Sequence, residues 1–113
     1  IRTSLFIDPD AEMVRRSLDV GADAVELHTG TYAHHPHDPA PLAALDAASA
    51  LGARLGLAVH AGHGLTVGNV GPLAAIPEIE ELNIGHAIVG RAIFVGLAEA
   101  VREIRAAMDA ARG

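Results

Sequence analysis

The chain has 113 residues, half of them hydrophobic, which is enough for one domain with a buried core. A net charge of −6 without any basic run excludes the electrostatic surface of a nucleic-acid-binding protein. The absence of cysteine excludes disulfides and thiolate chemistry, and no apolar run is long enough to cross a bilayer. We therefore expect a soluble, cytoplasmic protein that binds neither nucleic acid nor a membrane.

The first part of the sequence predicts two strands with a helix between them. Residues 3–8 are strand-like, and the segment after them suits a helix capped by Asp8 or Asp10. Gly21 suits the end of that helix, because glycine is common just past a helix C-terminus. Residues 24–30, AVELHTG, predict the second strand.

The middle of the sequence continues the same alternation. Residues 31–41 predict a loop, because they hold three of the six prolines. An alanine-rich helix over 42–55 and a strand over 55–62 follow. A glycine-broken helical segment over 65–77 and a short strand over 81–86 complete this region.

The C-terminal segment predicts one long helix with two different faces. Its apolar residues are spaced three or four apart, as on one face of a helix: Ile93, Leu97, Val101, Ile104 and Met108. The charged residues fall on the opposite face: Glu99, Arg102, Glu103, Arg105 and Asp109.

The alternation of strands and helices predicts an α/β fold with a parallel sheet. Four strand–helix units fit either a small open sheet or half of a (β/α)8 TIM barrel, which needs about 250 residues. The sequence opens on Ile1 without an initiator methionine, so we expect a piece of a longer or processed protein.

Polar residues gather where the predicted strands end, which is where parallel α/β folds bind ligands. They are Asp8, Glu26, His28, Thr29, His60, His63, Asn83 and His86. Glu26 interrupts an apolar strand, so it suits proton transfer inside a barrel, or else lies on a surface or pairs with an arginine. His63 stands between Gly62 and Gly64, which suits a general acid or base, or else an ordinary solvent-facing turn.

Gly85 and His86 predict a phosphate site, because they fall where the last helix begins. Free backbone N–H groups and the helix dipole favour anions there, and barrels bind phosphate after their last strands. The spacing from Gly85 to Arg91 lacks the Lys-Ser/Thr pair of a P-loop, which excludes that nucleotide motif.

The histidines leave metal binding as a weaker alternative. One tract lies in the predicted loop: His34, His35 and His37. We interpret it as a solvated loop, because a proline interrupts it and no cysteine accompanies it. A second set of residues forms a conceivable zinc site: His28, His60 and His63.

Five strings, in order, resemble the C-terminal half of pyridoxine 5'-phosphate synthase. They are SLFIDPD, VELHTGTYA, HAGHGLT, IPEIEELNIGHAIVGRAIFVGL and the closing ARG. The most specific parts are AGHGLT and ELNIGHAIVGRA, and the resemblance covers nearly the whole chain. It implies that residues 1–113 are the C-terminal half of a single (β/α)8 barrel, whose N-terminal half is also needed.

The resemblance implies a condensation of 1-deoxy-D-xylulose 5-phosphate with 3-amino-2-oxopropyl phosphate, giving pyridoxine 5'-phosphate, phosphate and water. It implies phosphorylated substrates, no metal, no organic cofactor and a cytoplasmic homo-octamer. His63 resembles the family's proton donor, Glu26 its transition-state stabiliser and Gly64 a contact to the amino-ketone phosphate. Gly85 and His86 resemble its phosphate-contacting pair.

The sequence also departs from the family. A second catalytic histidine, a second catalytic glutamate and the deoxyxylulose-phosphate site belong to the other half, and His60 stands where the family has asparagine. We therefore expect half an active site. Three rival functions stay open: an inactive fragment or partner chain that only binds phosphate, a different phosphosugar barrel such as an isomerase, and a zinc hydrolase.

Overall fold

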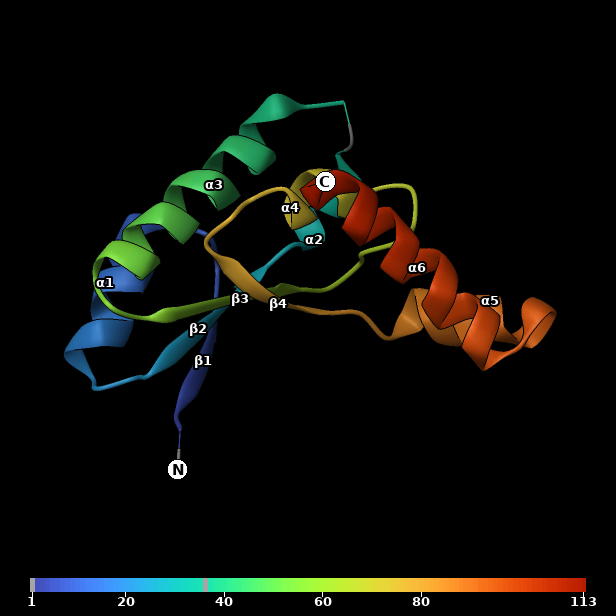
Figure 1. The fold of residues 1–113 in the computed structure, drawn as a ribbon. Helices are drawn as coiled ribbons and strands as arrows, with labels where there is room; N and C mark the ends of the chain where they lie inside the picture. The colour runs from blue at the N-terminus through green and yellow to red at the C-terminus, as the bar shows by residue number, and fades with distance from the viewer. Residues whose placement is uncertain (1, 36) are drawn as a thin grey trace.

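The computed structural model of the chain describes residues 2–35 and 37–113. Its strands are β1 (Ser4–Ile7), β2 (Ala24–His28), β3 (Ala58–Gly62) and β4 (Ile79–Asn83). They form one sheet in the order β1-β2-β3-β4, and every neighbouring pair is parallel (Figure 1). The predicted α/β fold with a parallel sheet is therefore confirmed.

Helices connect and follow the strands. They are α1 (Ala11–Asp19), α2 (Gly30–His34), α3 (Pro39–Arg54), α4 (Val70–Ala74), α5 (His86–Val95) and α6 (Leu97–Arg112). Asp10 caps α1, because its carboxylate accepts the N–H of Glu12 at 2.7 Å. Asp38 caps α3 in the same way, with Pro39 at the first helical position. No helix of the described residues is long and apolar enough to cross a membrane.

Two sequence predictions about helices are wrong. The region 31–41, predicted as a loop, contains most of α2 and the start of α3, because the Asp38 carboxylate caps α3 and Pro39 occupies a first-turn position that tolerates proline. The single long C-terminal helix is two helices, since Gly96 adopts φ +85° and ends α5. The apolar spacing runs through this break, so periodicity alone did not reveal it.

Helices α5 and α6, on either side of Gly96, pack against each other (Figure 1). Arg91 of α5 donates two hydrogen bonds to Glu103 of α6, at 3.0 and 3.2 Å, and these raise the pKa of Arg91. The pair joins the two helices after the turn at Gly96. The predicted charged face of α6 is therefore partly an interhelical surface rather than a purely solvated one.

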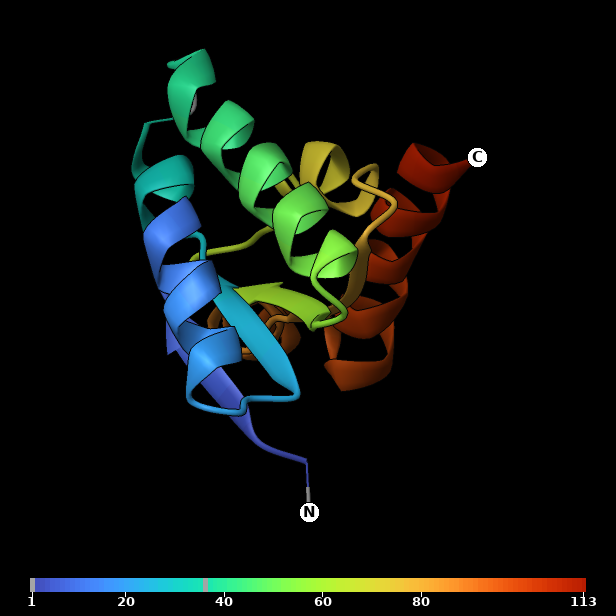
Figure 2. The ribbon, with the colours of Figure 1, turned by 90° about the vertical axis from the view of Figure 1, so that its left-hand side faces the viewer.

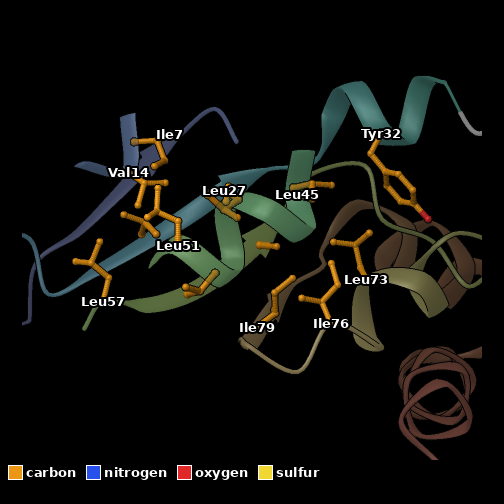
Figure 3. Packing of buried hydrophobic residues seen from close by; sticks show 14 of the residues in the cluster. Ile7, Val14, Leu27, Tyr32, Leu45, Leu51, Leu57, Leu73, Ile76 and Ile79 are labelled. Atoms are coloured by element: carbon orange, nitrogen blue, oxygen red, sulfur yellow. The ribbon is translucent and has the colours of Figure 1, made fainter. Parts of the chain in front are cut away.

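One face of the sheet carries the hydrophobic core. Val25 and Leu27 of β2 and Val59 of β3 point to this face, and all three are fully buried. Figure 2 shows α1 and α3 lying over β2 and β3 on this side. Figure 3 shows Val14, from α1, and Leu45 and Leu51, from α3, in the same cluster. Alternation along the strands therefore sends the intervening residues to the opposite face.

The opposite face of the sheet is open in the described part of the chain. Phe6, Glu26 and His60 share a register row on it, and the Phe6 side chain is 58% exposed. Phe6 belongs to the edge strand β1, and a large apolar side chain this exposed beside polar neighbours is typical of a surface that a further contact covers. This face therefore combines the polar side chains Glu26 and His60, as in a ligand-binding site, with the exposed apolar side chain of Phe6, as in an interface between protein segments.

Arg112 fastens α6 to the segment between α4 and β4. Its guanidinium donates to the carbonyls of Ala74, Ile76 and Ile79, with distances of 3.1 and 2.6 Å to the latter two. We expect Arg112→Ala to lower the free energy of unfolding by about 1–2 kcal/mol, because charge-assisted hydrogen bonds to buried backbone are lost. Urea denaturation measures this change.

Arg105→Ala is the matched control for this prediction. Arg105 pairs with Asp109 on the exposed surface of α6, at 3.2 Å, so its removal is expected to cost less than about 0.5 kcal/mol. Equal losses in the two variants would show that the anchoring by Arg112 contributes nothing specific.

Candidate active site

Polar side chains from β2 and β4 meet at the carboxyl edge of the sheet, over β3. Glu26 of β2 and Asn83 of β4 lie on the open face, and the Asn83 amide donates to Glu26 Oε1 at 2.6 Å. This bond bridges two strands that are not neighbours, because β3 runs between them. Glu26 therefore has an amide partner rather than the arginine that the sequence left open.

Gly62 makes the bridge possible. It lies in β3 between the two partners, and a Cβ built there would stand 2.9 Å from both Glu26 Oε2 and the Asn83 carbonyl oxygen. Any side chain would have to displace the carboxylate or the β4 backbone. Gly62, one of the two glycines that flank His63, therefore leaves the space that the Glu26 carboxylate occupies.

His63 has an unusual backbone. It adopts φ +100°, which costs a residue with a Cβ about 1–3 kcal/mol. The fully buried Thr29 holds this conformation, since its hydroxyl donates to the His63 carbonyl and its N–H donates to Gly62 O at 3.0 Å. Strain maintained by surrounding contacts is typical of functional positions.

The imidazole of His63 stacks on that of His28. The ring centroids are 4.7 Å apart and the planes differ by 23°. Gly30 leaves room for the stack, because a Cβ there would lie 2.4 Å from His28 Cε1 and 3.2 Å from His63 Cδ2. The strand end of β2 thus contributes a second histidine, which the sequence placed at a strand end and indicated only as a member of a conceivable zinc site.

A cavity of about 460 Å³ opens beside these residues, within the range of small-ligand sites. It lies between the loop after β3 and the start of α5. Its lining residues are His34, His63, Gly64, Leu65, Thr66, Asn83, Ile84, Gly85, His86 and Ala87. The structure therefore brings together four residues predicted from the sequence, and Glu26 adjoins them through Asn83.

Hydrogen bonds from Asn69 and Tyr32 fix the loop after β3. Asn69 accepts the Thr66 N–H at 2.7 Å and donates to Gly64 O at 3.2 Å. The Tyr32 hydroxyl donates to the Asn69 carbonyl at 2.7 Å, and burial raises the pKa of Tyr32, so this hydroxyl stays protonated at neutral pH. These bonds fix the backbone that carries Gly64 into the cavity wall.

The other histidines lie differently. His60 faces the open side of the sheet, with Nε2 3.9 Å from Glu80 Oε2, and does not line the cavity. His34 lines the cavity, whereas His35 and His37 do not, and Pro36 lies outside the described residues. Within residues 2–35 and 37–113, no three His, Asp or Glu side chains are arranged to hold a metal ion.

We expect Gly62→Ala to destabilise the protein by about 1–3 kcal/mol and to separate Glu26 from Asn83, because the methyl group overlaps both. Thermal unfolding and a crystal structure of the variant measure the two effects. Gly68→Ala is the control, since its Cβ would meet only Thr66 Oγ1, at an ordinary 3.7 Å. An intact Glu26–Asn83 bond in the Gly62 variant would contradict this account.

Comparison with known proteins places this chain in a family. The family model described as "Pyridoxal phosphate biosynthesis protein PdxJ" matches residues 1–110. The chain belongs to the PdxJ family. The resemblance drawn from the sequence strings is thereby confirmed.

Curated PdxJ relatives carry the name pyridoxine 5'-phosphate synthase. The relative from Thioalkalivibrio sulfidiphilus is 55% identical over 115 residues, covering 99% of this chain and 47% of its own length. The relative from Caulobacter vibrioides is 51% identical over 117 residues, covering 98% and 46%. The chain thus spans about half the length of the curated PdxJ proteins it matches.

Proposed function

We propose that this chain supplies the C-terminal half of a (β/α)8 barrel that synthesises pyridoxine 5'-phosphate. The observation that carries this proposal is the family match along nearly the whole chain, joined to a site at the carboxyl edge of four parallel strands. The substrates are those that the resemblance implies: 1-deoxy-D-xylulose 5-phosphate and 3-amino-2-oxopropyl phosphate. The products are pyridoxine 5'-phosphate, phosphate and water.

The start of α5 and the loop after β3 form the proposed phosphate site. Gly85 precedes the ten-residue helix α5 without any side-chain cap, so the first backbone N–H groups of α5 are free for an anion. A Cβ at Gly85 would meet nothing within 4 Å, so the backbone is open to a ligand from the cavity. Gly64 and His86 complete the wall on either side.

His63 and Glu26 have complementary proposed roles in the chemistry. The substrate amine and the sugar ketone condense to a Schiff base, and elimination of phosphate, dehydration and ring closure follow. His63, exposed at the cavity, protonates a leaving oxygen. Glu26, oriented by the Asn83 amide, stabilises the cationic iminium that develops nearby.

The remaining half of the barrel is proposed to cover the open sheet face. Phe6 on that face is 58% exposed, and the outer edges of β1 and β4 are unpaired among the described residues. Both features expose surface that folded proteins normally cover. By the same resemblance we propose a cytoplasmic homo-oligomer that uses neither a metal nor an organic cofactor.

A segment swap tests the proposed function. This chain replaces the matching segment of the Thioalkalivibrio sulfidiphilus synthase, and turnover of the two substrates is measured. Retained turnover supports the synthase. A folded swap that binds inorganic phosphate without turnover would favour the rival function, a chain that only binds phosphate.

We expect His63→Ala in the active swap to lower kcat by about 10²–10⁴-fold, because a positioned proton donor is lost. Substrate affinity is expected to change little, since the phosphate contacts are made elsewhere. His35→Asn, an exposed histidine outside the cavity lining, is the control. Near-normal turnover of the His63 variant would remove the proton-donor role.

Gly85→Ala is expected to raise the KM for the amino-ketone phosphate by roughly tenfold, because its methyl group occupies space that the anion needs. Folding should be unaffected, since no protein atom lies within 4 Å of the new Cβ. Gly90→Ala is the matched control, with the same free space but a position inside α5. Equal KM values would contradict the location of the phosphate site.

A further inference from the structure

We propose that His28 is a positioning residue for His63. On this proposal, stacking of the two imidazoles holds the ring of His63 in the orientation that proton transfer requires. The proposal rests on the proposed function insofar as it concerns catalysis. The juxtaposition itself is independent of that function, because it follows from the ring geometry at the ends of β2 and β3.

His63 needs such a support. Its side chain is exposed at the cavity, and its imidazole makes no hydrogen bond to the described residues. The hydroxyl of Thr29 holds the backbone of His63 but does not restrict rotation of the ring. A proton donor must stay within hydrogen-bond reach of the reacting atom, so a freely rotating ring would be productive only part of the time.

His28 is well placed to restrict that rotation. Its ring lies 4.7 Å from the ring of His63, nearly parallel to it at 23°. Such offset aromatic pairs are favourable beyond the area that they bury. The contact joins residues that are 35 positions apart in the sequence, and the parallel pairing of His28 with Gly62 creates it.

The ring of His28 is itself fixed on two sides. The Gly30 N–H donates to His28 Nδ1 at 3.2 Å, so the neutral ring carries its proton on Nε2. Phe6 of β1 packs against it edge-on, with centroids 5.1 Å apart and planes at 86°. Three rings from β1, β2 and the loop after β3 therefore form a ladder, with His28 in the middle.

Two substitutions of His28 separate the stack from the hydrogen bond. His28→Phe keeps an aromatic ring for stacking but removes the acceptor for Gly30. His28→Asn keeps an acceptor near the position of Nδ1 but removes the ring. A structural role of His28 at the end of β2 depends on the hydrogen bond, whereas the positioning role depends on the ring.

Steady-state kinetics of the active segment swap test the positioning role. We expect His28→Asn to lower kcat roughly tenfold, the upper end of what an aromatic pair contributes, while KM changes less than about twofold. His28→Phe is expected to keep kcat within about threefold of the parent. The reverse order, with His28→Phe the poorer enzyme, would overturn the proposal in favour of the structural role.

Nuclear magnetic resonance provides a readout that needs no turnover. In the segment swap without substitutions, the ring protons of His63 are expected to show an upfield chemical-shift change caused by the ring current of His28. The shift should persist in His28→Phe and disappear in His28→Asn. Unchanged His63 signals in a folded His28→Asn variant would overturn the proposal, whereas an inactive parent with the expected shifts would count only against the proposed synthase function.

Discussion

The site depends on the absence of a side chain at Gly62. Parallel pairing places Gly62 between Glu26 and Asn83, two residues on strands that do not touch. The hydrogen bond between them crosses directly above this glycine, where a Cβ would meet both partners at 2.9 Å. One missing methyl group therefore lets β2, β3 and β4 share a single polar centre on the open face of the sheet.

The same glycine begins the strained loop that presents His63. Gly62 O accepts from Thr29 N–H, and the next residue turns to φ +100° under the Thr29 hydroxyl. Thr29 thus bonds both to Gly62, which lies beside Glu26, and to His63, whose imidazole faces the cavity. The cost of this strain is offset by a fully buried residue whose own hydrogen bonds are made to the end of β3.

The two faces of the sheet divide stability from chemistry. Val25, Leu27 and Val59 pack beneath α1 and α3, whereas Glu26 and His28 face away from the helices. This division explains how a chain of 113 residues has both a buried hydrophobic core and an open, partly apolar face. The chain spans about half the length of the PdxJ relatives that it matches.

The sequence by itself determined the order of the four strands, the parallel sheet and the sheet edge near which Glu26, His63, Gly64, Gly85 and His86 lie. Local signals suffice for these, because periodicity, caps and glycines act over a few residues. Only the tertiary structure decided that His28 stacks on His63, that Asn83 holds Glu26 and that Gly96 splits the last helix. The first two contacts join residues 35 and 57 positions apart, which no local pattern encodes, and the apolar spacing of the last helix continues unchanged through its break.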